Sequence, residues 1–298
     1  MCAKSVKPDA KVSTTGHVWD GIEELNNPLP RWWVWVFILT IVFAAGYIIA
    51  YPAWPLIHGA TPGVLGYSTR AEVQKDIDAV DAQNAPIKAR LVAADLTAID
   101  ADPELKKFAM SDGAAVFRTN CAQCHGAGAA GVQGKGYPNL LDNDWLWGGT
   151  LDAIHTTLTH GIRATVDPDT RISAMPRFGT DELLTRDEIG QVVEYVLQLS
   201  GQDHDATLAA AGTQLFADNC AACHGDAGMG NRDMGAPNLT DAIWLYGGDR
   251  TAITTTVTLA RNAMMPAWGY AAAGSKPRLT EDQIRAVAVY VHALGGGE

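Results

Sequence analysis

The sequence predicts a mainly α-helical protein with one N-terminal membrane-spanning helix followed by two copies of one small helical domain. Three observations lead to this fold class. An uncharged stretch of 20 residues runs from Trp32 to Tyr51, a cysteine-histidine motif occurs twice at a spacing of 99 residues, and an amphipathic helical pattern follows each motif. At 298 residues the chain is long enough for two ordinary domains plus additional segments.

Residues 32–54 are predicted to form the membrane helix. Twenty residues rising about 1.5 Å each cover about 30 Å, which is the thickness of the hydrocarbon core of a bilayer. Aromatic residues mark both ends of the stretch, as they do at membrane interfaces: Trp32, Trp33 and Trp35 at one end, and Tyr47, Tyr51 and Trp54 at the other. A cleaved signal peptide is the alternative, but the apolar run is longer than an ordinary signal core and follows 31 polar residues.

The charges around this stretch predict its orientation. Lysines at positions 4, 7 and 11 and Arg31 precede it, whereas the first basic residue beyond it is Arg70. The positive-inside rule then makes residues 1–31 a cytoplasmic segment, in which no element is predicted. The rest of the chain is expected outside the bacterial inner membrane, in the periplasm.

Residues 55–108 are predicted to be a periplasmic connector. Its first part is rich in Gly and Pro and reads as a loop, and the remainder reads as broken helices interrupted at Pro86 and Pro103. Two interpretations stay open, a simple tether and a surface that contacts a membrane partner.

Residues 109–202 and 203–298 form an internal repeat. Pro138-Asn139-Leu140 recurs as Pro237-Asn238-Leu239 at the same spacing as the motifs, and the first copy holds about nine extra residues near Asp167. Each copy closes with an amphipathic helix that a capping box introduces, Thr185 with Glu188 and Thr280 with Gln283.

The repeated motif is Cys-x-x-Cys-His, the attachment pattern of haem c. We expect Cys121 and Cys124, and likewise Cys220 and Cys223, to hold haem through thioethers, with His125 and His224 as axial iron ligands. A shared zinc site would need the two cysteine pairs to converge on one ion, although they lie 99 residues apart and each has its own histidine. The prediction is two covalently attached haem c groups. Cys2, the fifth cysteine, is expected to be a free thiol.

Methionine sulfur is the expected sixth iron ligand, because it favours ferrous iron in electron carriers. Aligning Met-Pro-Arg-Phe-Gly with Met-Pro-Ala-Trp-Gly selects Met175 and Met265, and Met264 is the alternative to the latter. Other methionines and histidines are expected to be packing or surface residues: Met110, Met229, Met234, His155, His160, His204 and His292.

Each repeat resembles a class I cytochrome c domain. The resemblance implies a first helix that ends at the haem motif and crosses the last helix, so that Phe117 would lie against Tyr195 and Phe216 against Tyr290. It also implies that the carbonyl of Pro138 or Pro237 orients the proximal histidine.

These residues predict an electron carrier rather than an enzyme. With His and Met on each iron there is no vacant position, and we find no paired catalytic carboxylates and no nucleophile with a base. The formal charge of −11 argues against a nucleic-acid partner and suits either a basic protein partner or plain solubility.

Over essentially its whole length the chain resembles the dihaem subunit of cbb3-type haem–copper oxidases. The segment from Trp19 to Pro30 followed by Trp32-Trp33, then span, connector and two haem domains, carries this resemblance. It implies partners: a cytochrome c donor, a monohaem subunit, and a catalytic subunit that reduces O2 and pumps protons. Three alternatives remain open, a free membrane-anchored carrier similar to cytochrome c4, a dehydrogenase subunit and a haem peroxidase.

Overall fold

The computed structural model describes residues 13–298. Cys2 and the three N-terminal lysines lie outside the described residues. The chain divides into two compact units, which meet between Gln83 and Asn84. Each unit is considered by itself below.

The first unit begins with a β-hairpin where no element was predicted. Strands β1 (Thr14–Trp19) and β2 (Ile22–Leu25) pair antiparallel, with Trp19 opposite Ile22. The two residues between them, Asp20 and Gly21, both have positive φ, 49° and 86°. Asp-Gly is a favoured sequence for the two-residue hairpin turn, so this dipeptide was the available signal.

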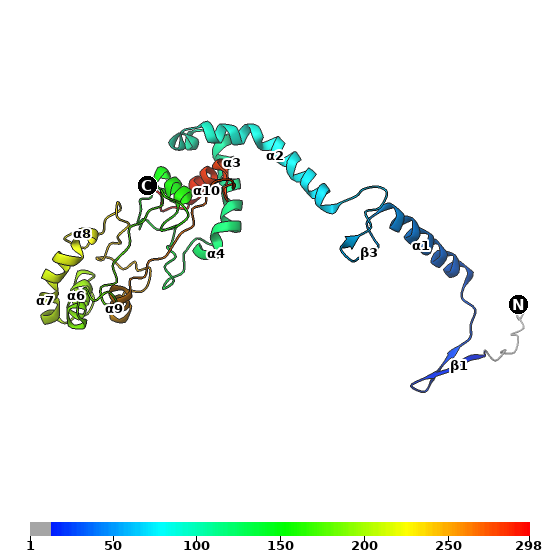
Figure 1. Cartoon of the computed structure of the whole chain (residues 1–298), viewed down its shortest axis with the longest axis horizontal. Coiled ribbons are helices and arrows are strands. Elements are labelled where there is room, and N and C mark those ends of the chain that lie inside the picture. Colours follow the sequence, from blue (N-terminus) through cyan, green and yellow to red (C-terminus); the bar gives the residue numbers. More distant parts are fainter. Residues whose placement is uncertain (1–12) are drawn as a thin grey trace, which may run out of the picture. The chain divides into compact units, whose positions relative to one another are not determined.

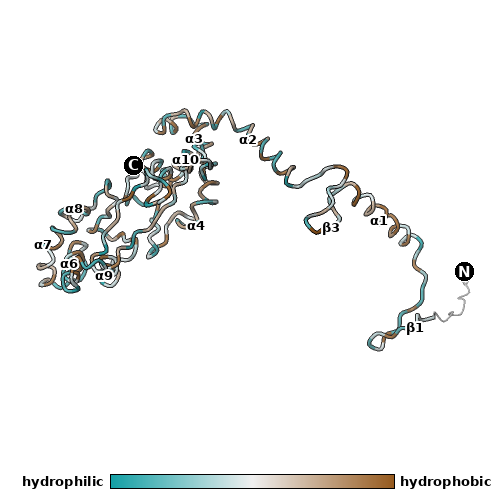
Figure 2. Tube along the Cα trace, viewed as in Figure 1, coloured by the Kyte–Doolittle hydropathy of each residue, from teal (hydrophilic) through white to brown (hydrophobic). Residues whose placement is uncertain are grey.

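The predicted membrane helix is confirmed as α1 (Arg31–Ala50), a helix of 20 residues with no buried side chain. By length and composition it is the one candidate span in the described part of the chain. Hydrophobic colouring predominates along it in Figure 2. The helix ends just before Pro52, four residues earlier than the predicted span, and the short pair β3 (Pro55–Leu56) and β4 (Gly59–Ala60) follows.

The predicted helix break at Pro86 is wrong, because α2 (Thr69–Ala93) runs through it. A proline removes only one intrahelical hydrogen bond, and the helix beyond it is held by Leu91, which is fully buried. The prediction at Pro103 is confirmed in part, since α3 (Pro103–Val116) begins there after the 3-10 helix η1 (Leu96–Ala101). Asp102 caps α3 through the backbone N–H groups of its first turn.

The second unit contains the haem motifs and is mainly helical, as predicted (Figure 1). After α3 come the π-helical turn η2 (Phe117–Cys121), α4 (Ala122–His125), α5 (Leu151–His160), α6 (Arg186–Leu199), α7 (Ala206–Asn219), α8 (Ala221–His224), α9 (Arg250–Leu259) and α10 (Glu281–His292). Both predicted capping boxes are present: Thr185 with Glu188 starts α6, and Thr280 with Gln283 starts α10.

The closing helices pack against the opposite copy of the repeat, contrary to the prediction. In Figure 1, α10 lies beside α3 and α6 beside α7, as the backbone contacts also show. The ring of Phe117 lies 5.6 Å from that of Tyr290, and Phe216 lies 5.2 Å from Tyr195. The expected pairs Phe117–Tyr195 and Phe216–Tyr290 are therefore wrong. One physical reason is local: only residues 200–205 join α6 to α7, and so short a link favours an antiparallel helix pair.

Two hydrophobic cores result, and each draws on both copies of the repeat. The first core combines Val116, Phe117 and Ile154 with residues of α10 such as Val287, and the second combines α6 with Phe216, Ile253 and Val257. The ranges 109–202 and 203–298 thus describe the two copies of the repeat in the sequence. Each hydrophobic core, however, contains residues of both copies.

The last part of the predicted connector belongs to the folded unit. Leu91, Leu96 and Ile99 are buried in a third cluster together with Ala286 and Val289 of α10. Residues 84–108 therefore support the helix pair α3–α10 rather than acting as a tether.

Candidate haem sites

Each Cys-x-x-Cys-His motif lies on a short helix that directly follows the first helix of its repeat. In the first motif Cys121 is buried, Cys124 is exposed, and His125 is the last residue of α4. In the second, Cys220 is buried, Cys223 is partly buried, and His224 ends α8. One helical turn therefore places both thiols and the imidazole of each motif along one cavity wall.

The first thiol of each motif is held in its neutral form. Burial, and then the neighbouring thiol Cys124, raise the pKa of Cys121 to about 11, and burial beside Cys223 does the same for Cys220. Neutral thiols are what addition to a haem vinyl group consumes.

Both motif histidines are oriented as the resemblance to class I cytochrome c implies. The Nδ1–H of His125 donates to the carbonyl of Pro138 at 3.1 Å, and that of His224 to Pro237 at 3.0 Å. Burial lowers the pKa of both imidazoles, which favours the neutral form. With Nδ1 engaged, Nε2 is the nitrogen left for an iron, and the carbonyl increases its basicity.

A glycine makes this carbonyl contact possible in each repeat. A Cβ on Gly131 would lie 2.4 Å from the carbonyl oxygen of Tyr137, and one on Gly230 would lie 2.7 Å from that of Ala236. Both glycines also have positive φ, 68° and 83°. The loop after each motif can therefore close tightly enough to bring its proline carbonyl under the histidine ring.

A largely apolar cavity of about 580 Å³ connects the two motifs. Its lining contains all four motif cysteines, both motif histidines and both predicted methionines, Met175 and Met265. Two covalent anchors, an imidazole nitrogen and a thioether sulfur around an apolar space are the donor set that haem c requires. The residues therefore fit two haem c groups.

The structure favours Met265 over its neighbour Met264. Met265 packs partly buried against the core that contains Cys121, whereas the side chain of Met264 is 58% exposed. Met175 packs against the other core, the one that contains Cys220. Each predicted methionine therefore lies with the cysteines of the opposite repeat.

The histidines that were set aside have other partners, and within residues 13–298 none of them lines the cavity. His155 contacts Glu281, His160 contacts Asp167, His204 contacts the carbonyl of Gln202, and His292 contacts that of Glu298. Met229 is exposed, Met234 lies at the cavity wall, and Met110 packs against the third cluster. These positions stay predictions of packing or surface roles.

Sequence reasoning missed a pair of equivalent arginines. Arg171 lies over the Trp147 ring at 5.0 Å and donates to the Thr157 hydroxyl at 2.7 Å. Arg261 lies over the Tyr246 ring at 4.7 Å and donates to the hydroxyl of Thr256, the residue equivalent to Thr157. The extra residues of the first repeat lie between Ile162 and Arg171, and these two residues pair in an isolated β-bridge. The two arginines lie 90 residues apart, the spacing that also relates Met175 to Met265, so extending the alignment of the Met-Pro motifs by four residues would have revealed them.

Three arginines give the cavity a cationic part. Its lining contains Arg163, Arg261 and Arg278, and within the described residues none of them forms an ion pair with a carboxylate. Burial lowers the pKa of the Arg163 guanidinium, yet such a group stays charged at neutral pH. Haem carries two propionate carboxylates, so these guanidinium groups are suited to be their counter-ions.

Helical repeats that present Cys-x-x-Cys-His motifs, carbonyl-oriented histidines and methionines around one apolar cavity define a dihaem c-type cytochrome. The comparisons agree along the chain. Residues 11–58 match the N-terminal domain of cytochrome oxidase-cbb3, FixP; residues 108–196 match cytochrome C oxidase, cbb3-type, subunit III; and residues 209–295 match cytochrome c.

Full-length relatives narrow this class to one family. The cbb3-type cytochrome c oxidase subunit CcoP of Cereibacter sphaeroides is 64% identical, and that of Rhodobacter capsulatus 59%, each over 99% of this chain and 100% of the relative. The subunit FixP of Rhizobium meliloti is 49% identical over 99% of this chain and 98% of the relative. The chain belongs to the CcoP/FixP family of cbb3-type cytochrome c oxidase subunits. Accordingly it binds two covalently attached haem c groups.

Proposed function

We propose that this chain is the electron-entry subunit of a cbb3-type oxidase. It takes electrons from a cytochrome c donor and passes them through its two haems to the monohaem subunit, and from there to the catalytic subunit. The observation that carries this proposal is the shared cavity, which both Cys-x-x-Cys-His motifs and both Met-Pro loops line. Two haems held in one cavity would lie close together, which gives electrons a short path.

The haem iron supplies reversible one-electron chemistry, and the residues of the chain set its conditions. Cys121, Cys124, Cys220 and Cys223 anchor the two groups, and His125 and His224 donate Nε2 while the proline carbonyls hold their Nδ1–H. Met175 and Met265 provide the sixth ligands, which raise the reduction potential by favouring the ferrous state. The apolar lining excludes water from the iron.

The proposed ligation gives this chain an electron-transfer role without a catalytic centre. A methionine on each iron closes the position at which O2 or peroxide would bind, which disfavours the peroxidase alternative. O2 reduction and proton pumping are therefore assigned to the catalytic subunit of the complex.

The membrane arrangement follows from α1 and the charges around it. The length and composition of α1 suit a single crossing of the inner membrane. In this proposal residues 1–31 lie in the cytoplasm and both haem sites lie in the periplasm. The basic residues before the helix and the absence of one between Arg31 and Arg70 in the sequence support this orientation. Haem attachment outside the cytoplasmic membrane, as the class of protein implies, agrees with it.

A pulldown under gentle detergent extraction tests the proposal. We expect affinity purification of the tagged full-length chain to recover haem b and O2 uptake with cytochrome c as reductant, together with two haems c. A tagged variant without the Trp19–Pro30 segment tests whether this family-specific sequence is needed for the other subunits to co-purify. Recovery of haem c alone, from mild as well as harsh extraction, would instead identify a free carrier.

A further inference from the structure

We propose that residues 51–67, the loop that follows α1, rest in the surface of the lipid bilayer. The inference goes beyond electron transfer and rests on the membrane crossing of α1 proposed above. Lipid, rather than another protein, then covers the apolar surface of this loop. Four exposed aliphatic side chains reach the acyl chains: Leu56, Ile57, Val64 and Leu65.

The first argument is that the loop is attached to the last turn of α1. Val64 N–H donates to the carbonyl of Ile49 at 2.9 Å, and Leu65 N–H donates to that of Ala50 at 3.1 Å. The last four carbonyls of a helix have no partner within the helix, and such groups are costly where water is scarce. Donors from its own loop let α1 end within the membrane surface, and they hold the loop at the level of the helix end.

Two further contacts fix the loop at this place. A Cβ on Gly63 would lie 2.5 Å from the carbonyl oxygen of Ala50, and Gly63 has a φ of 72°, so this close approach requires glycine. The ring of Tyr67 lies 5.4 Å from that of Tyr51, edge to face. The chain therefore leaves the end of α1 and returns to it.

Between these contacts the β3–β4 hairpin pairs its backbone groups with one another. Thr61 N–H donates to the carbonyl of Trp54 at 2.9 Å, and Trp54 N–H donates to the Thr61 hydroxyl at 3.1 Å. Within the hairpin Leu56 lies opposite Gly59. A hairpin whose backbone is paired in this way can enter an apolar medium, because it presents mainly side chains to its surroundings.

The side chains that the loop presents are apolar on more than one side. Ile57 in the hairpin turn is 94% exposed, and Val64 is 78% exposed. Pro55 and Leu56 are neighbours in β3, both are exposed, and neighbouring residues of a strand point to opposite faces. A protein partner would cover one face of the hairpin, whereas lipid can surround it.

Charge is absent from this part of the sequence. No Lys, Arg, Asp or Glu occurs between Arg31 and Arg70, so the uncharged stretch continues well past the end of α1. The loop instead contains Trp54, and tryptophan is a residue type that is enriched at membrane interfaces. Its one histidine, His58, lies beside Ile57 in the turn, and an imidazole combines an apolar ring with a polar edge, which suits the headgroup region.

Fluorescence quenching on the full-length, haem-loaded chain in phosphatidylcholine nanodiscs tests the proposal. In a C2S background, single cysteines are introduced as I57C and V64C and labelled with the fluorophore NBD. L39C, within α1, is the control for lipid contact, and K75C, at an exposed position of α2, is the control for water contact. Quenching by a spin label on the lipid acyl chain reports lipid contact, and quenching by iodide reports water contact.

We expect the probes at positions 57 and 64 to be quenched by the spin-labelled lipid, and several-fold less by iodide than the probe at position 75. Lack of lipid quenching at both positions, with position 39 quenched, would overturn the proposal and leave the membrane crossing in place. Shielding from iodide that arises only when the other oxidase subunits are present would assign the surface to a protein and would also overturn it. Lack of lipid quenching at position 39 as well would overturn the membrane crossing itself.

A second pair of variants tests the attachment of the loop to α1. In the I57C chain, G63A should push the loop away from Ala50 and lower the lipid quenching at position 57. G66A is the matched control, since Gly66 also has a positive φ, 61°, and an added Cβ meets no atom within 4 Å there. It should leave the quenching unchanged. Equal losses in both variants would contradict the role of the close approach at Gly63.

Discussion

Gly212 of α7 packs directly against the backbone of α6, and G212A is predicted to push the two helices apart. A Cβ at this position would lie 2.1 Å from the carbonyl oxygen of Gln191 and 3.1 Å from the Cβ of Tyr195. Carbon–oxygen contacts normally begin at about 3.3 Å, so the helices must separate by about 1 Å. No rotamer change relieves the clash, because the atom that is met belongs to the backbone.

The magnitude follows from two opposing effects. Overpacking of this kind costs up to about 3 kcal/mol, and replacing a helical glycine by alanine returns up to about 1 kcal/mol. We therefore expect G212A to lower the free energy of unfolding by about 2 kcal/mol. Gly190 on α6 is the matched control, since an added Cβ meets no atom within 4 Å there, so G190A should be neutral or stabilising.

Denaturant titration of the oxidised full-length chain, followed by haem absorbance, measures both variants. The midpoint should fall for G212A and stay or rise for G190A, with an unchanged denaturant dependence. If G212A were as stable as G190A, the close packing of α6 on α7 would be wrong, and so would the packing of this closing helix against the opposite repeat.

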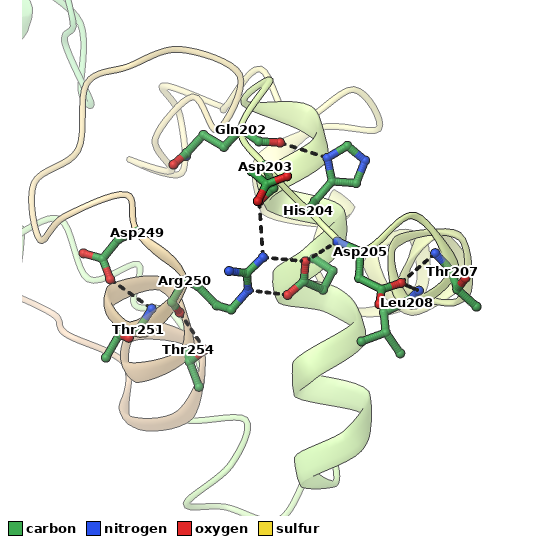
Figure 3. A network of polar contacts seen from close by, with 11 residues as sticks. Gln202, Asp203, His204, Asp205, Thr207, Leu208, Asp249, Arg250, Thr251 and Thr254 are labelled. Atoms are coloured by element: carbon green, nitrogen blue, oxygen red, sulfur yellow. Dashed lines mark hydrogen bonds and ion pairs between the residues drawn. The ribbon is translucent and has the colours of Figure 1, made fainter.

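Three further predictions concern the haem surroundings and the ion pair between Glu194 and Arg250. G131A should displace the carbonyl of Pro138 from His125 and raise the reduction potential of the first haem, because a weaker Nδ1–H hydrogen bond makes the histidine less basic. The control is G134A, which is also at positive φ but in open space, and it should leave the potential unchanged. A redox titration measures both variants. Burial, with Asp241 nearby, raises the pKa of Asp144 to about 6, so its ionisation lowers the stability of the folded protein as the pH rises from about 4 to 6. D144N should therefore stabilise the protein by about 1 kcal/mol at pH 7 and not at pH 4, as measured by thermal melts. An equal effect of D144N at pH 4 and pH 7 would contradict this prediction. The pKa of Glu194 is shifted in the opposite direction, to below 4.5, because the Arg250 guanidinium donates to its carboxylate oxygens (Figure 3). Its ionised carboxylate therefore stabilises the folded protein above that pH, and this stabilisation is lost as the pH falls through the pKa of the folded state. R250Q should therefore destabilise the protein at neutral pH and progressively less in acid, and a pH-independent loss would show that the ion pair is not responsible.

Much of the local structure could be predicted from the sequence because short-range physics determines it. The apolar stretch ending at Pro52 predicts α1, and Thr185 and Thr280 predict where α6 and α10 begin. The cysteine-histidine motifs predict which residues line the cavity, and their repetition predicts two equivalent sites.

The partners of the closing helices could not be predicted from helical periodicity. The apolar stripes of α6 and α10 are nearly alike, so either helix could cover either haem motif in a comparison of hydrophobic patterns. The distinguishing information lies in a few polar positions, above all Glu194 with Arg250 where the other core has Val289 and Leu151. Comparing non-identical positions of the two repeats would have revealed it.

Two local predictions failed for simpler reasons. A proline inside a helical pattern predicts an interruption at Pro86, but the burial of Leu91 outweighs the loss of one hydrogen bond. The hairpin before α1 was missed because its strands are short and exposed, although Asp20-Gly21 is a recognisable turn sequence.

Stopped-flow mixing of reduced cytochrome c with the oxidised, anaerobic oxidase complex tests the central claim most directly. If this chain is where electrons enter, the haem c absorption must rise before that of haem b, and a complex whose chain carries C121A, C124A, C220A and C223A must reduce its haem b far more slowly. Reduction of haem b at the native rate in that complex would show that electrons enter elsewhere and would contradict the account.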